Sequence, residues 1–139
     1  MQLLLVFFLF ACTVQSLLGI GTLQSVAVNG RLICDGRPAA GVKVRLYDMG
    51  VFSDKRMAEV HTDINGNFHI VGRSREISTI DPKMNVYHKC NYPGKCYKQF
   101  GIIIPDNYIT VGDTPQHPYN VGTLNLANKY PDTTTECFY

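Results

Sequence analysis

Apolar residues that recur at every second position are the feature that most constrains the fold of this chain. Val26, Val28, Leu32 and Cys34 follow this rhythm, and residues 42–47 alternate in the same way. A period of two places successive side chains on opposite faces of an extended chain. Each of these segments therefore predicts a β-strand with one buried face.

Glycine and proline interrupt the chain too often for long helices. Twelve Gly and seven Pro are spread over 139 residues, and they separate further strand-like segments at 84–90, 100–104, 109–111 and 121–126. Short strands with turn signals about every ten residues are typical of an all-β domain. We expect a single domain that folds as a seven- to eight-stranded antiparallel β-sandwich.

The charge balance excludes one class of partner. Thirteen Lys and Arg stand against eleven Asp and Glu, which gives a net charge of +2. No run of basic residues offers the concentrated positive patch that phosphate backbones require. We therefore expect no nucleic-acid partner.

The N-terminal segment is typical of a secretory signal. Residues 3–14 form an almost unbroken apolar run, which is shorter than the roughly 20 residues needed to span a bilayer. We predict a signal peptide at residues 1–16 with cleavage after Ser16, or alternatively after Gly19, and a folded domain at 20–139. An uncleaved signal anchor is the competing interpretation. The expected location is extracellular.

The cysteines agree with secretion. Cys12 lies in the predicted signal, so the mature chain keeps Cys34, Cys90, Cys96 and Cys137. An even number of cysteines in a secreted chain predicts two disulfides. Three pairings are possible; the close spacing of Cys90 and Cys96 favours a bridge between them, which leaves Cys34 with Cys137. The spacing does not suit a metal site.

The segment around Asp63 and Gly66 predicts a β-hairpin. If Asp63 opens a type I turn and Gly66 takes the left-handed conformation, one face of the hairpin becomes apolar. His61 then faces His69 on the other face, with Glu59 beside them. These three side chains are a conceivable metal site, but two histidines on a polar sheet face need no metal to explain them. We expect neither a metal nor a cofactor.

A cationic, tyrosine-rich segment is the best candidate for a binding surface. It contains three lysines, three tyrosines and one histidine, with no carboxylate among residues 87–98. A rigid aromatic loop loses little entropy on binding, and lysine with tyrosine suits an acidic protein face or an anionic headgroup. The alternative is a solvated loop without a function. The candidate residues are Tyr87, His88, Lys89, Tyr92, Lys95, Tyr97 and Lys98.

Five ordered blocks of sequence resemble the nematode transthyretin-like family: GRLIC at 30–34, PAAGVKVRLYD at 38–48, TDINGNF at 62–68, IDP at 80–82 and YHKC at 87–90. The resemblance covers nearly all of the predicted mature chain. It implies a secreted, prealbumin-like β-sandwich. It also implies a place among mostly uncharacterised extracellular proteins, some of which are associated with recognition of cell-surface lipid or with secretion into a host.

Two functions follow as expectations. The first is a secreted, non-enzymatic binding protein that recognises an extracellular protein, a lipid surface or a host component. The second is an oligomeric carrier of a small hydrophobic ligand, as in transthyretin. The related hydroxyisourate hydrolases carry a C-terminal Tyr-Arg-Gly-Ser motif, whereas this chain has Glu136, Cys137, Phe138 and Tyr139 there. We therefore expect no hydrolase activity; the oligomeric state stays open.

Overall fold

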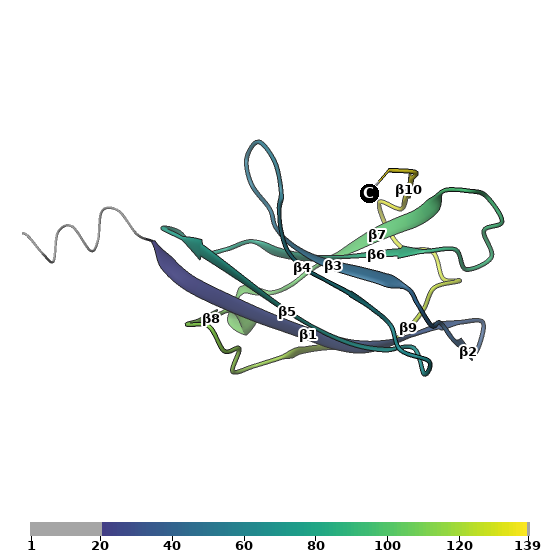
Figure 1. Cartoon of the computed structure of the whole chain (residues 1–139), viewed down its shortest axis with the longest axis horizontal. Coiled ribbons are helices and arrows are strands. Elements are labelled where there is room, and N and C mark those ends of the chain that lie inside the picture. Colours follow the sequence, from purple (N-terminus) through teal and green to yellow (C-terminus); the bar gives the residue numbers. More distant parts are fainter. Residues whose placement is uncertain (1–20, 139) are drawn as a thin grey trace, which may run out of the picture.

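Two stacked β-sheets form the structure, a computed structural model that describes residues 21–138 (Figure 1). Within those residues there are ten strands and one short 3-10 helix. The strands are β1 (Thr22–Cys34), β2 (Arg37–Pro38), β3 (Lys43–Asp48), β4 (Lys55–His61), β5 (Asn67–Glu76), β6 (Pro82–His88), β7 (Tyr97–Ile103), β8 (Thr110–Val111), β9 (Tyr119–Asn125) and β10 (Thr134–Glu136), and the helix is η1 (Asp106–Tyr108).

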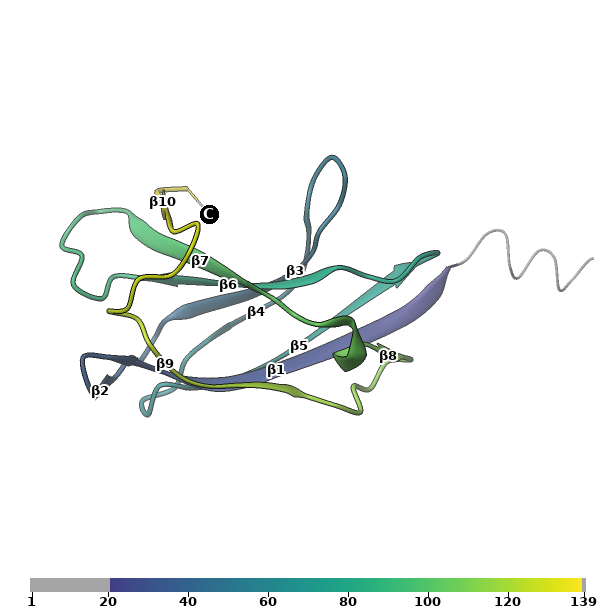
Figure 2. The ribbon, with the colours of Figure 1, turned by 180° about the vertical axis from the view of Figure 1, so that it is seen from behind.

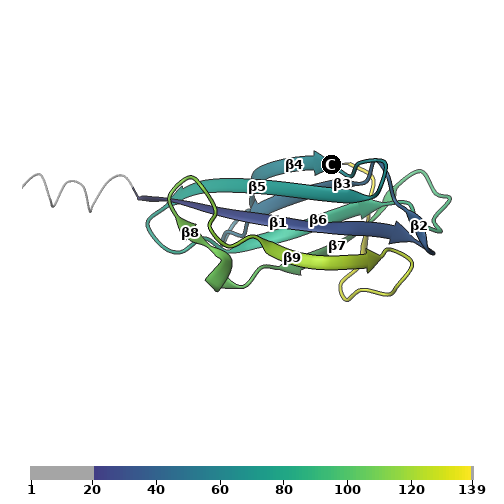
Figure 3. The ribbon, with the colours of Figure 1, turned by 90° about the horizontal axis from the view of Figure 1, so that it is seen from below.

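Strand β1 is the centre of the first sheet. Strands β2, β5, β8 and β9 all pair with it, and Figure 3 shows β5 and β9 along its two sides. The second sheet has the order β10-β7-β6-β3-β4. All pairings are antiparallel except β1 with β9, which run in parallel. This confirms the predicted β-sandwich and adds one parallel pair.

The core lies between the two layers, which Figure 2 shows from behind. The alternating residues that predicted strands face inward: Val26 and Val28 of β1 and Val44 and Leu46 of β3 are fully buried. Each such side chain stabilises the fold by about 1.5–3 kcal/mol relative to exposure. Ile70, Met84, Val86 and Phe100 complete the centre of the same cluster.

The turn at residues 63–66 is confirmed, but the hairpin built on it is wrong. The Gly66 N–H donates to the Asp63 carbonyl oxygen at 2.9 Å, and Gly66 has a φ of +80°. Beyond the turn the strands separate: β4 pairs with β3, and β5 pairs with β1 in the other sheet. A turn signal fixes the chain reversal locally, whereas the sheet that each flanking strand joins depends on its pairing with strands elsewhere in the chain.

The predicted disulfide pairing is also wrong. The structure joins Cys34 to Cys90 and Cys96 to Cys137. Spacing along the chain measures only the length of the enclosed loop, whereas a bridge requires the two Cβ atoms to approach. Cys90 lies just beyond the end of β6 and Cys34 at the end of β1, so stacking the two sheets brings these residues within 5.7 Å between Cα atoms.

The predicted signal peptide at residues 1–16 and both candidate cleavage sites lie outside the described residues. In the part of the chain that the structure describes, no helix is long and apolar enough to cross a membrane.

Candidate functional site

Both disulfides end in the loop that connects β6 to β7, residues 89–96, which we call the stapled loop. The β6–β7 ladder ends at the pair His88 and Lys98. The Tyr92 N–H then donates to the Lys89 carbonyl oxygen at 3.0 Å, so the chain turns away from the ladder. Cys90 ties the start of the loop to β1, and Cys96 ties its end to Cys137 beyond β10.

One hydrogen bond attaches the stapled loop to the turn between β1 and β2, and a second bond links that turn to β9. The Asn91 Nδ2 donates to the Asp35 carboxylate at 2.8 Å, and the Asp35 N–H donates to Asn125 Oδ1 at 3.2 Å. Asp35 belongs to the turn between β1 and β2, and Asn125 ends β9. The loop is therefore fixed covalently and by hydrogen bonds to the ends of both sheets.

Lysine and tyrosine side chains of this region form two cation–π pairs. Lys89 Nζ lies 4.7 Å from the ring centroid of Tyr97, and Lys98 Nζ lies 5.5 Å from that of Tyr92. Such pairs contribute about 0.5–1 kcal/mol at exposed sites. Lys95, within the loop, is exposed. Two of the three positive charges are thus held in defined places.

Two of the seven predicted surface residues are buried. Tyr87 is 5% exposed and His88 is 4% exposed, because both belong to β6, a central strand of its sheet. Tyr87 lies beside Arg45, whose Cζ atom is 5.4 Å from the ring centroid. The structure therefore corrects the predicted surface to five accessible residues: Lys89, Tyr92, Lys95, Tyr97 and Lys98.

The fold brings carboxylates close to this cationic surface. Asp35 bonds to the stapled loop, and Glu136 of β10 lies opposite Tyr97. Neither residue is near in sequence, so the absence of carboxylates from residues 87–98 overstated the positive charge. Three lysines against two carboxylates still leave the region positive.

A cavity of about 450 Å³ lies beside the stapled loop. Its walls come from the end of β6, from the first half of β7 and from the segment that connects β9 to β10. Figure 2 draws this connecting segment in yellow-green to yellow. Its lining includes His88, Lys98, Phe100, Leu126, Lys129 and Tyr130. Sequence reasoning missed the contribution of residues 126–133, because this segment shows no alternation and Tyr130 stands alone among polar residues.

His88 is the buried polar group of this cavity. Its Nδ1 accepts a hydrogen bond from the Cys90 N–H at 3.1 Å. Burial and the nearby Lys98 ammonium lower the pKa of His88 to about 4. The ring is therefore neutral at pH 7, and because Nδ1 acts as an acceptor, Nε2 carries the proton.

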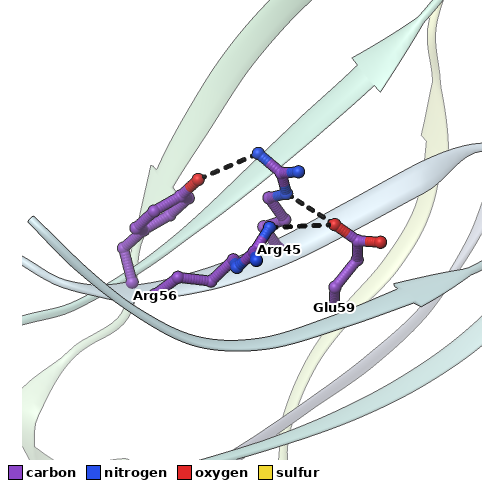
Figure 4. A network of polar contacts seen from close by, with 4 residues as sticks. Arg45, Arg56 and Glu59 are labelled. Atoms are coloured by element: carbon purple, nitrogen blue, oxygen red, sulfur yellow. Dashed lines mark hydrogen bonds and ion pairs between the residues drawn. The ribbon is translucent and has the colours of Figure 1, made fainter. Parts of the chain in front are cut away.

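A second polar cluster is formed by side chains of β3 and β4 (Figure 4). Glu59 accepts hydrogen bonds from Arg45 at 2.7 Å and from Arg56 at 3.4 Å, and Arg45 donates to the Tyr47 hydroxyl at 3.2 Å. The bond from Arg45 lowers the pKa of Glu59. Burial alone lowers the pKa of Arg45, but the bonds to Glu59 and Tyr47 outweigh it and raise that pKa.

The predicted arrangement of His61, His69 and Glu59 is not formed. His61 lies opposite Lys43, and His69 lies opposite Asn29 in the other sheet. Glu59 is engaged by two arginines. Within residues 21–138 no group of three metal-ligating side chains comes together.

Comparison with known proteins gives a consistent result. The model of the transthyretin-like family matches residues 29–105. Transthyretin-like protein 5 of Caenorhabditis elegans is 45% identical over 123 residues, which covers 86% of this chain and 88% of that protein. Transthyretin-like protein 2 of the same organism is 38% identical over 133 residues and covers 90% of both chains. The fold, the matched residues and these relatives agree, and the chain belongs to the transthyretin-like family.

Proposed function

We propose that this chain is a secreted, non-enzymatic binding protein that recognises an anionic membrane surface through the stapled loop. The observation that supports this most is the convergence of both disulfides on that loop. Side chains that are fixed before binding lose less conformational entropy when they bind. Lys89 and Lys98, at the two ends of the loop, are held against Tyr97 and Tyr92 in this way, and Lys95 is exposed between them.

Secretion is supported by the apolar N-terminal run and by the two disulfides, which persist in oxidising compartments. Binding rather than catalysis is supported by the use of the polar groups. Two lysine ammoniums lie over tyrosine rings, and the His88 Nδ1 already accepts the Cys90 N–H. These contacts hold two of the positive charges in place and occupy Nδ1 of His88.

The test measures binding to vesicles of phosphatidylcholine with and without phosphatidylserine. The variant carries Lys89→Gln, Lys95→Gln and Lys98→Gln together. Each lysine near an anionic membrane contributes about 1 kcal/mol, so the variant should bind about 100-fold more weakly. Added salt should weaken the binding of the parent protein as well.

A matched control removes three positive charges elsewhere. Arg73, Arg75 and Lys83 lie on β5 and at the start of β6, away from the stapled loop, and replacing all three with Gln changes the net charge equally. This control should retain most of the binding. Equal binding by the loop variant and the parent, without salt dependence, contradicts the proposal. Equal losses in the loop variant and the control assign binding to net charge instead of the loop.

A protein partner is the competing outcome. If the loop variant loses binding to intact cells but neither protein binds the vesicles, the partner is an acidic protein surface. The loop remains the site in that case, and the membrane part of the proposal is overturned.

A further inference from the structure

The cavity beside the stapled loop has the composition of a binding site for a small molecule. Its volume of about 450 Å³ falls in the range of about 300–1,000 Å³ that is usual for ligand pockets. It lies at the end of the sandwich where the disulfides are, and its walls come from β6, from the stapled loop, from β7 and from the β9–β10 connection.

One part of the wall is apolar and held in place. The rings of Phe100 and Tyr130 are stacked, with centroids 4.1 Å apart and planes inclined by 7°. The Tyr130 hydroxyl donates to the Asn125 carbonyl oxygen at 2.8 Å, and the Thr133 hydroxyl donates to the Tyr130 carbonyl oxygen at 2.7 Å. Leu126, which is 3% exposed, lies beside them. A flat or aliphatic ligand body fits such a wall.

The polar part of the wall consists of hydrogen-bond donors. His88 is buried and presents the N–H of Nε2, for which no acceptor is found among the described residues. Lys98 and Lys129 add two positive charges, and none of the lining residues is a carboxylate. A buried donor beside two ammonium groups, in a lining without a carboxylate, favours an acceptor that carries negative charge.

We infer that this cavity binds a free small organic anion, a carboxylate on an apolar body. The carboxylate lies near His88, Lys98 and Lys129, and the apolar body lies against Tyr130 and Leu126. The inference shares Lys98 with the membrane proposal but does not rest on it, because Lys129 and the β9–β10 connection line the cavity and take no part in that proposal.

The experiment follows fluorescence of 1-anilinonaphthalene-8-sulfonate with the full disulfide-bonded protein. The dye is an aromatic anion, and its emission rises in apolar sites. Decanoate should displace it at least tenfold better than decanol, which has the same chain without the charge. Equal displacement by the two overturns the anionic part of the inference. Displacement by phosphatidylserine vesicles as effective as that by decanoate overturns the choice of a free anion.

Two substitutions locate the site. Ala127→Trp should fill the cavity and abolish dye binding, whereas Ala40→Trp, at an exposed position, should leave it unchanged. Lys129→Gln should weaken decanoate binding about three- to fivefold, and Lys83→Gln should not. Retained dye binding by a folded Ala127→Trp variant overturns the inference.

A measurement on the unsubstituted protein covers the case in which Ala127→Trp does not fold. Amide chemical shifts recorded during decanoate titration should change for Cys90, Leu126 and Tyr130, and should not change for Gly50 and Ile77 at the other end of the sandwich. Changes spread evenly over the chain, or confined to exposed apolar loops, overturn the site.

Discussion

The two ends of the sandwich are closed by different chemistry. At the end where β1 and β6 finish, the disulfides Cys34–Cys90 and Cys96–Cys137 fix the loops. At the end where β1 and β6 begin, buried side chains bond to backbone groups instead. Gln24 Oε1 accepts the Ile80 N–H at 3.0 Å, and Asp48 Oδ1 accepts the Asp81 N–H at 2.9 Å.

This difference separates two ways of ordering a loop. The hydrogen-bonded end orders its loops by burying polar groups, with Gln24 5% exposed and Asp48 7% exposed. The disulfide-bonded end needs less burial, because covalent bonds limit the chain. Lysines and tyrosines can therefore stay accessible there and still hold defined positions. The candidate binding surface and the cavity both lie at that end.

The largest expected effect comes from removing the bridge between the sheets. Replacing Cys34 and Cys90 with Ser together should lower the free energy of unfolding by about 4 kcal/mol, given the sequence separation of 56 residues. Replacing Cys96 and Cys137 should cost less, about 2 kcal/mol, because β10 is short and mostly exposed and can detach without global unfolding. Urea unfolding of the two double variants measures both values. A larger loss for the second pair contradicts this ranking.

The next largest loss of unfolding free energy is expected at the hydrogen-bonded end. Gln24→Met keeps the volume of the side chain but leaves the buried Ile80 N–H without its acceptor, which should cost about 2–3 kcal/mol. Gln116→Met is the control, because Gln116 is exposed. The penalties at the two ends should add to within about 0.5 kcal/mol in a combined variant. Strong non-additivity in urea unfolding contradicts independent closure of the two ends.

The third effect is a pH dependence confined to the disulfide-bonded end. The pKa of His88 is lowered to about 4 in the folded protein, whereas an unfolded histidine has a pKa of about 6.5. The unfolded chain therefore binds more protons between these values, so stability is complete above pH 6.5 and falls as the pH drops. From pH 8 to pH 5 this group should remove about 2 kcal/mol.

His69 provides the control for the pH dependence that we assign to His88. Unfolding midpoints at pH 8 and pH 5 should differ less in a His88→Gln variant than in the parent, and His69→Gln, at an exposed position, should behave like the parent. An unchanged pH dependence in the His88 variant contradicts burial of a neutral imidazole at this site.

Local patterns predicted the fold well because they report local physics. The alternation at 42–47 and 84–90 reflects apolar side chains that face the core at every second position, and the Asp63 turn is closed by neighbouring residues. The partners of β4 and β5 were not predictable in this way, since the choice of sheet depends on contacts far along the chain. The cysteines show the same limit: Cys90 and Cys96 are close in sequence, yet each bonds to a distant residue.

The candidate site was predicted in part for a similar reason. Lysines and tyrosines of a single segment are visible as a composition, so Lys89, Tyr92 and Lys95 were found. The inward direction of His88 depends on the register of β6 within its sheet. The contribution of Tyr130 depends on the β9–β10 connection folding back onto Phe100, for which the sequence carries no periodic signal.

The smallest expected effect concerns the loop between β3 and β4, which projects from the sandwich in Figure 1. Phe52 is 100% exposed and Val51 is 95% exposed. A side chain that buries no surface contributes no burial energy, so Phe52→Ser should change the free energy of unfolding by less than about 0.5 kcal/mol.

Tyr130→Ser at the other end should cost about 2–3 kcal/mol, because Tyr130 stacks on Phe100. Urea unfolding of both variants compares the same kind of truncation at a free loop and at a packed connection. A loss above 1 kcal/mol for Phe52→Ser means that this aromatic ring packs against the sandwich in solution, and the contrast between an open loop and a fixed one then disappears.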